Sequence, residues 1–165
     1  FKDTAKTDYS MQRPNKRFMQ SGMYLPGMKS DALVNIAVGV DISGSVSDSD
    51  FQQFVSDTHS VMKTFKPKKI DFIQFDTRIQ HHDVLRSLGD FKKLSFTGRG
   101  GTCPRELLEW AKINKPKVLM IYTDGEFYMK NLPEYSGNVL WLIHNNPSFK
   151  APYGDVIHYE LPSNY

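Results

Sequence analysis

Residues 33–45, Leu-Val-Asn-Ile-Ala-Val-Gly-Val-Asp-Ile-Ser-Gly-Ser, decide the fold. The first eight, residues 33–40, are almost continuously apolar and largely β-branched, which is typical of a strand buried on both faces of a parallel sheet. The last five, residues 41–45, add a carboxylate and two hydroxyls directly after that strand. Ligands of open α/β sheets bind beyond the carboxyl ends of the strands. The stretch therefore predicts a central strand and a polar site at its end.

The rest of the chain alternates strand and helix patterns. Ser47 is expected to cap a helix that carries Asp48 and Asp50 in its first turn and ends at Pro67, and Pro104 suits the start of a second helix. Strands are expected at 69–75, 79–85, 118–122, 139–143 and 156–159, with 79–85 as a polar edge strand, while 91–96 stays undecided. This alternation predicts an α/β fold: a three-layer, Rossmann-like open sheet, mostly parallel, with one antiparallel edge strand and helices on both faces.

Composition excludes several classes of protein. The chain has 165 residues, 39% of them hydrophobic, and no apolar run approaches the roughly 18 residues that span a bilayer. A single cysteine, Cys103, cannot form an internal disulfide or a thiolate cluster for zinc, which favours a reducing compartment. We therefore expect a cytoplasmic protein that does not engage a membrane. The chain starts with Phe1, without a leader pattern, so we expect it to come from inside a longer gene product.

The net positive charge of the chain comes from its N-terminal segment. Residues 1–30 hold six basic and two acidic side chains, a net charge of +4, whereas the whole chain carries only +3. The body is therefore slightly acidic, and a nucleic-acid partner is not expected. We expect two parts: residues 1–30 as an extended lead-in that packs on the body through Phe18, Tyr24 and Leu25, and residues 31–165 as one domain.

Three polar loops follow expected strands or precede expected helices and together suggest a metal site. They span residues 41–45, 100–102 and 123–125, and they contain only hard oxygen donors. Such donors suit Mg²⁺, or Mn²⁺ or Ca²⁺, and are wrong for zinc or copper. Two carboxylates cannot surround a cation completely, so a coordination position is left for an acidic group from outside. The candidate ligands are Asp41, Ser43, Ser45, Thr102 and Asp124.

The same residues carry a resemblance. The order Asp41-x-Ser43-x-Ser45, then Thr102 in a Gly-Gly-Thr loop, then Asp124 in Thr-Asp-Gly resembles the metal-ion-dependent adhesion site of von Willebrand factor A (VWA) domains. The stretches Arg-Pro-Asn-Lys-Arg-Phe at 13–18 and Val-Leu-Trp-Leu-Ile at 139–143 are similar to bacterial and phage VWA-like domains that follow a putative metallopeptidase domain. Cys103 departs from the pattern, since Asp or Asn often follows that Thr.

The resemblance implies a function as well as a fold. It implies a divalent-cation-dependent protein-interaction module without catalytic activity of its own, forming the C-terminal part of a larger metallopeptidase-like protein. Ser43, Ser45 and Thr102 would give hydroxyl ligands, and Asp41 and Asp124 would act directly or through water. The cation would then accept an Asp or Glu carboxylate from a protein partner.

Other interpretations of these residues stay open at this point. Asp-x-Ser-Gly-Ser could simply cap a strand-to-helix turn. A phosphoryl-transfer enzyme of haloacid-dehalogenase type would use Asp41 as nucleophile and Asp124 on Mg²⁺, but Ser43 stands where its general acid should be. A zinc site at His81 and His82 is disfavoured because neighbouring strand residues point to opposite faces. No His-Glu-x-x-His motif is present.

Overall fold

The computed structural model describes residues 34–44, 46–96 and 100–159. Within this part of the chain, six strands form one sheet in the order β3-β2-β1-β4-β5-β6. All neighbouring strands are parallel except β2 and β3, which are antiparallel. The strands are β1 (Asn35–Asp41), β2 (Lys69–Phe75), β3 (Ile79–Leu85), β4 (Val118–Thr123), β5 (Asn138–His144) and β6 (Asp155–Tyr159).

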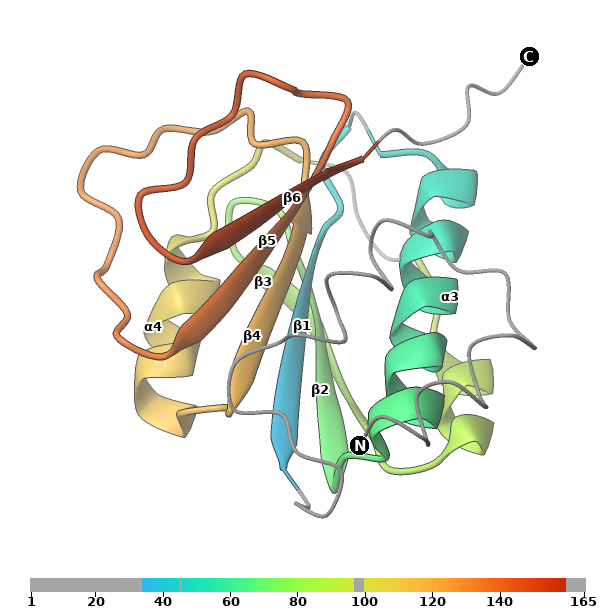
Figure 1. The fold of residues 1–165 in the computed structure, drawn as a ribbon. Coiled ribbons are helices and arrows are strands. Elements are labelled where there is room, and N and C mark those ends of the chain that lie inside the picture. The colour runs from blue at the N-terminus through green and yellow to red at the C-terminus, as the bar shows by residue number, and fades with distance from the viewer. Residues whose placement is uncertain (1–33, 45, 97–99, 160–165) are drawn as a thin grey trace.

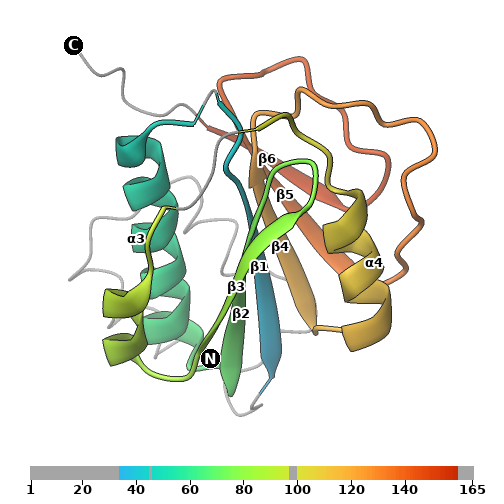
Figure 2. The same ribbon diagram turned by 180° about the vertical axis from the view of Figure 1, so that it is seen from behind.

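Helices cover both faces of the sheet (Figures 1 and 2). Helix α3 (Asp48–Phe65) and the short 3₁₀ helix η2 (Leu88–Lys93) lie on one face, and α4 (Arg105–Asn114) lies on the other. The N-terminus of α3 is fixed by a capping box, in which the Ser47 hydroxyl accepts from the Asp50 N–H and the Asp50 carboxylate accepts from the Ser47 N–H. The expected α/β architecture, with its antiparallel edge, is confirmed.

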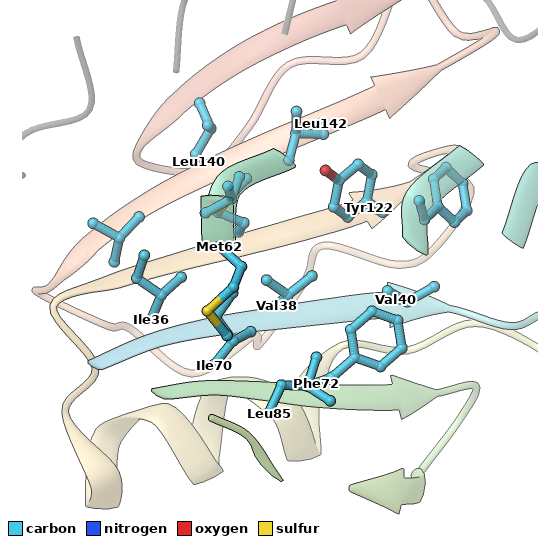
Figure 3. Close-up of a cluster of buried hydrophobic side chains, with 14 of the residues drawn as sticks. Ile36, Val38, Val40, Met62, Ile70, Phe72, Leu85, Tyr122, Leu140 and Leu142 are labelled. Carbon is cyan, nitrogen blue, oxygen red and sulfur yellow. The ribbon is translucent and has the colours of Figure 1, made fainter. Parts of the chain in front are cut away.

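Apolar side chains form one core on each face of the sheet. The core under α3 contains Val38, Val40 and Phe72 from the strands and Phe54 and Val61 from the helix, and Figure 3 shows it from close by. The core under α4 contains Leu107 and Leu108 of the helix and alternate residues of the same strands. Because every central strand is buried on both faces, each is almost continuously apolar, as the sequence indicated.

On the α4 side, two long loops cover the part of the sheet that further helices cover in many α/β proteins. The loops span residues 124–137 and 145–154, and each follows a strand of this half of the sheet. The Trp141 indole N–H of β5 donates to the Tyr153 carbonyl at 2.7 Å, and the Tyr153 hydroxyl donates to the Pro133 carbonyl at 2.9 Å. Trp141 and Tyr153 therefore tie both loops to β5 and to each other.

The predicted strands can be compared with the strands of the structure. The expected strands agree to within one or two residues at each end, and the undecided segment 91–96 begins with the end of η2. The expected lead-in, residues 1–30, with Phe18, Tyr24 and Leu25, lies outside the described residues.

Candidate metal centre

The candidate site lies where the sheet changes direction. From β1 the chain goes outward to β2 and β3 on one side, whereas β4, β5 and β6 extend the sheet on the other side. The carboxyl ends of β1 and β4 are therefore neighbours, although Asp41 and Val118 are 77 positions apart in the sequence. Such a switch point leaves a crevice at the carboxyl edge of an open sheet. Asp41 is the last residue of β1, and Asp124 follows β4 directly.

Asp41 is buried and held in one orientation by both of its oxygens. Its Oδ1 accepts the Ser43 N–H at 2.8 Å, and its Oδ2 accepts the Thr123 hydroxyl at 2.8 Å. The first bond closes the turn after β1, and the second joins that turn to the end of β4. The Ser43 hydroxyl bonds to this carboxylate as well, so three hydrogen bonds are directed at its two oxygens, which have four lone pairs between them. This arrangement suits a carboxylate that contacts a cation through water.

The environment of Asp41 disfavours its negative charge. Burial raises the pKa of Asp41, hydrogen bonds from Ser43 and Thr123 partly oppose the shift, and the negative charge of Asp124 adds to it. The two carboxylates therefore repel each other at a site with little water. A cation between them would offset this repulsion, which is a physical reason to expect one there.

Asp124 begins a turn that is held by three hydrogen bonds. Its Oδ1 accepts the Glu126 N–H at 3.0 Å, and its own carbonyl accepts the Asn146 side-chain amide at 2.8 Å. The Gly125 N–H donates to the Thr123 hydroxyl oxygen at 3.1 Å. Gly125 has φ of +76° and lies against the Phe149 ring, a conformation and a closeness that exclude a side chain. The turn thus holds Asp124 rigidly beside Asp41.

The loop with Thr102 is tied to both neighbouring strand ends. The Gly44 N–H donates to the Gly100 carbonyl at 3.1 Å, and the Cys103 N–H donates to the Asp76 carbonyl at 2.8 Å. Gly100 packs directly on the Asp76 carboxylate, so a larger residue could not take its place there. The carboxylate itself is oriented by Gln80 and by the Arg78 N–H. Thr102 is half-buried in this loop, beside the turn that follows β1.

The predicted ligands fall into three groups in the structure. Asp41, Ser43 and Asp124 come together at the ends of β1 and β4, since Ser43 bonds to Asp41 through its side chain as well as its N–H, and Asp41 and Asp124 interact electrostatically. The loop of Thr102 is joined to the same turn through Gly44. Ser45 lies outside the described residues.

Three further residues shape the site without having been predicted for it. They are Thr123, which orients Asp41, Asn146, which holds the backbone of Asp124, and Asp76, which supports the Thr102 loop. Thr123 ends β4 and Asp76 follows β2 directly, and a polar residue at a strand end was the available signal. Their contacts depend on which strands are neighbours, and that the sequence does not specify.

The donor set determines which ion these residues would fit. Among the described residues, no three His, Cys, Asp or Glu side chains are grouped closely enough to hold a metal ion. A cation at Asp41 and Asp124 would therefore need hydroxyls and water for its remaining ligands. That chemistry fits Mg²⁺, Mn²⁺ or Ca²⁺ and does not fit zinc.

The histidine pair of β3 forms two separate interactions. His82 bonds to Asp71 at 2.8 Å and packs edge-on against Trp110, on the α4 face. His81 pairs with Asp83 at 3.1 Å. Because adjacent residues of a strand point to opposite faces, the two imidazoles cannot share one ligand. The expectation against a zinc site is consistent with this geometry.

An open, mostly parallel sheet with carboxylate and hydroxyl oxygens gathered at its switch point is the architecture of a class of α/β domains. No helix in the described part of the chain is long and apolar enough to cross a membrane. The family model described as "VWA-like domain (DUF2201)" matches residues 36–160. The chain belongs to this VWA-like family, whose fold is that of a protein-interaction module.

Two individual proteins are similar to this chain. An uncharacterized protein of Thermotoga maritima is 27% identical over 114 residues, which are 68% of this chain and 27% of the relative. The chain therefore spans about a quarter of that relative's length. The crystal structure of the ArnB paralog VWA2 from Sulfolobus acidocaldarius aligns with 81% of this chain and 42% of that chain, at 10% identity and a TM-score of 0.47.

Proposed function

We propose that this domain is a divalent-cation-dependent protein-interaction module. The observation that carries the proposal is the pairing of Asp41 and Asp124 at the switch point, with the Asp41 carboxylate buried although its environment disfavours its charge. A merely structural turn could be capped by an Asn or Ser at lower cost, because burying a charge without compensation is expensive. A bound Mg²⁺, Mn²⁺ or Ca²⁺ supplies the compensation.

The residues of the site have distinct roles in this proposal. The cation, when bound, supplies a positive centre with coordination positions left for a carboxylate of the partner. Asp41 and Asp124 provide the negative charge that attracts the ion, while Ser43, Ser45 and Thr102 provide neutral oxygens. Thr123 keeps the Asp41 carboxylate aimed at the site.

Metal binding is tested by calorimetric titration of Mg²⁺ and Mn²⁺ into the wild-type chain and three variants. Asp41→Ala and Asp124→Ala should each weaken binding at least tenfold, which corresponds to about 1.4 kcal/mol. Asp155→Ala is the matched control, since Asp155 is an exposed carboxylate at the start of β6. Equal affinity in wild type and Asp41→Ala would overturn the assignment. Turnover of a phosphate ester that Asp41→Asn abolishes would instead support the phosphoryl-transfer alternative.

A Thr102 variant can distinguish binding of the cation from binding of the partner. Water replaces a neutral hydroxyl as an Mg²⁺ ligand at little cost, so Thr102→Ala should barely change cation affinity. It should reduce cation-dependent capture of a partner, because the loop position that accepts the partner's carboxylate would no longer contribute a ligand. Loss of metal binding in this variant would show that the cation needs the Thr102 hydroxyl even without a partner, and would contradict this prediction.

We further propose that the domain works within a larger protein with a metallopeptidase-like part. The matched region is only 27% of the Thermotoga maritima relative, which leaves room there for further domains. In such a protein, this domain would hold an acidic partner near the rest of the chain. Pull-down with the full-length gene product, with and without chelator, tests this arrangement.

A further inference from the structure

Strand β3 ends the sheet on one side, and no strand in the described part of the chain pairs with its outer edge. Figure 2 shows β3 in front of the other strands. Residues 81–85 pair with β2 in an unbroken register, whereas the register shifts at Gln80. We call the outer backbone groups of residues 81–85 the β3 edge. Such a row of N–H and C=O groups can pair with a strand of another chain.

The β3 edge has few of the features by which proteins block such pairing. Residues 81–85, His-His-Asp-Val-Leu, include neither Lys nor Pro, the residues that most often protect an edge strand. The side chains of His81 and His82 are 45% and 33% exposed, and Val84 is 38% exposed. The register shift at Gln80 keeps the available segment short, which suits a reversible contact rather than a permanent one.

The two faces of β3 carry different side chains. His81, Asp83 and Leu85 lie on the α3 face, and His82 and Val84 lie on the α4 face. Residues directly opposite each other in an antiparallel pair lie on the same face of the joined sheet. Two copies of β3 related by a twofold axis therefore keep both faces continuous only when the axis passes through a residue.

The charges on the α3 face select one register for such a pair. With the axis at His82, His81 of each copy lies opposite Asp83 of the other copy, so two His–Asp pairs flank the axis. With the axis at Asp83, two carboxylates would lie directly opposite each other. Opposite charges across a pair of strands are stabilising and like charges are destabilising. His81 and Asp83 already meet at 3.1 Å within one chain, so the four groups would alternate in sign when the imidazoles are protonated.

The residue on the axis does not oppose this register. His82 bonds to Asp71 at 2.8 Å, and Asp71 belongs to β2, on the side of β3 away from the edge. The ring also packs edge-on against Trp110 of α4, with the ring centroids 5.4 Å apart. Each His82 imidazole is therefore held toward its own sheet and next to a carboxylate, not toward the imidazole of the second copy.

We propose that the β3 edge is a contact between two copies of this chain, in which residues 81–85 pair antiparallel about a twofold axis at His82. A twofold axis makes such a contact self-complementary, since each copy offers the same edge to the other. The β6 edge has no comparable charge match, because Asp155 would lie opposite Tyr159 if the axis passed through Ile157. The inference goes beyond the metal site and does not depend on it.

The proposed contact also places the two candidate metal sites. Because β3 runs antiparallel to its copy, β1 of one copy runs opposite to β1 of the other. Asp41 and Asp124 lie at the carboxyl ends of β1 and β4, so the two sites would lie at opposite ends of the joined sheet. Each site would stay open to a partner of its own.

Sedimentation equilibrium of the purified chain, from about 10 μM to about 1 mM, tests the contact. The wild type should show a reversible monomer–dimer equilibrium. Asp83→Lys should raise its dissociation constant at least tenfold, because the new ammonium group would lie opposite His81. Asp155→Lys makes the same charge change on β6, at the other end of the sheet, and should leave the dissociation constant unchanged.

Three results of this experiment would overturn the proposal. They are a wild type that stays monomeric over the whole range, equal dissociation constants in the wild type and Asp83→Lys, and an equal rise in Asp155→Lys. The last result would place the contact away from the β3 edge.

A mixing experiment tests the register. His81→Asp leaves two carboxylates on the α3 face of each edge, and Asp83→Lys leaves only basic groups there. Each variant alone should dimerise at least tenfold more weakly than the wild type. Mixed together, they should form a heterodimer at least tenfold tighter than either variant alone, because each acidic group then lies opposite a basic one. Absence of this heterodimer would refute pairing about His82.

Amide hydrogen exchange of the wild type needs no substitution and so does not depend on the folding of a variant. As the protein concentration rises, N–H groups of residues 81–85 that point away from β2 should exchange several-fold more slowly. Exchange in β6 should stay unchanged. Slowing in β6 instead of β3, or no slowing in either strand, would contradict the proposal.

Discussion

At the scale of single residues, Asp41 combines opposing demands. Its two oxygens orient the turn after β1, but burial and the charge of Asp124 both raise its pKa and so oppose its ionised form. In the proposed metal site, such a residue would lower the stability of the metal-free domain and gain stability when the cation is bound. The effect of replacing it should therefore change sign with the metal.

Asp41→Asn is expected to stabilise the metal-free domain by on the order of 1 kcal/mol, because it removes a buried charge and keeps the side chain's shape. At saturating Mg²⁺ the wild type should be the more stable protein, because a ligand bound only by the folded state stabilises it. Urea unfolding in chelator and in Mg²⁺ measures both. A variant that is less stable than wild type in chelator would contradict the electrostatic account.

Asp71 gives a pH-dependent prediction at a position far from the site. Burial opposes its charge, but hydrogen bonds from His82 and Lys69 outweigh that effect and lower its pKa below 3.8. Its carboxylate therefore stabilises the fold above pH 3.8, and this contribution is lost as the pH falls through the lowered pKa. Asp71→Asn should cost about 1–3 kcal/mol at neutral pH, and the difference from wild type should shrink in acid.

The control for Asp71 is Asp83 of β3, which pairs with the half-exposed His81. Asp83→Asn should lower the free energy of unfolding by less than Asp71→Asn, since the Asp83 side chain is 23% exposed and that of Asp71 only 4%. Equal losses in the two variants, measured by urea unfolding across the pH range, would show that burial of Asp71 is not what matters.

At the scale of elements, the close approach of α4 to β1 depends on Gly39. A Cβ at this position would collide with a δ-methyl of Leu107, so the helix can pack at its present distance only against glycine. Gly39→Ala should lower the free energy of unfolding by about 1–3 kcal/mol through overpacking. Adding Leu107→Val should recover part of that loss, and unfolding of the two single variants and the double variant measures it.

The control is Gly44→Ala, because nothing lies within 4 Å of a Cβ at Gly44. It should leave stability within about 0.5 kcal/mol of wild type. If the losses of unfolding free energy in Gly39→Ala and Leu107→Val simply added in the double variant, the collision with Leu107 would not be the cause of the Gly39→Ala loss.

The elements could be predicted from sequence where one physical signal dominated. Strands β1, β4 and β5 are continuous apolar runs, and α3 has a cap, an apolar stripe and Pro67 after its end. Helix η2 escaped prediction because Leu88 is exposed, Gly89 follows it, and none of its residues is buried. The loop of residues 124–137 has no helical or strand-like pattern of apolar residues from which its structure could be inferred.

The candidate site was accessible from sequence for a related reason. Parallel strands bring their carboxyl ends to one edge, so polar residues after β1 and β4 could be grouped before the fold was known. The contact of Thr123 with Asp41 and the contribution of Asn146 could not be predicted, because these bonds depend on the order β1-β4-β5. Local pattern predicts an element, whereas the neighbours of an element come from tertiary packing.

At the scale of the whole molecule, Tyr153 links the two loops that replace helices on the α4 side. Tyr153→Phe removes the bond to the Pro133 carbonyl and should cost about 1 kcal/mol. Burial, together with the charge of Glu134, raises the pKa of Tyr153 to about 12. The folded state thus keeps a proton that the unfolded state releases from pH 10 upward, and stability falls as the pH rises through about 12.

Tyr153→Phe should therefore flatten the loss of stability between pH 10 and about 12, which thermal melts in alkaline buffers measure. Tyr128→Phe is the matched control, because Tyr128 is 90% exposed. An alkaline profile that Tyr153→Phe leaves unchanged would assign the dependence to another group, such as Tyr135, whose pKa burial also raises.

The hydrogen bond between Asp41 and Thr123 has a kinetic consequence. It joins residues 82 positions apart, so the two carboxylates meet only after the intervening strands and helices have closed a long loop, and we expect such a contact to form late in folding. Mg²⁺ should therefore leave the refolding rate almost unchanged and slow unfolding instead. Stopped-flow chevron plots should show the unfolding limb shifted down by the metal, whereas a faster refolding limb would mean that the ends of β1 and β4 already meet in the transition state.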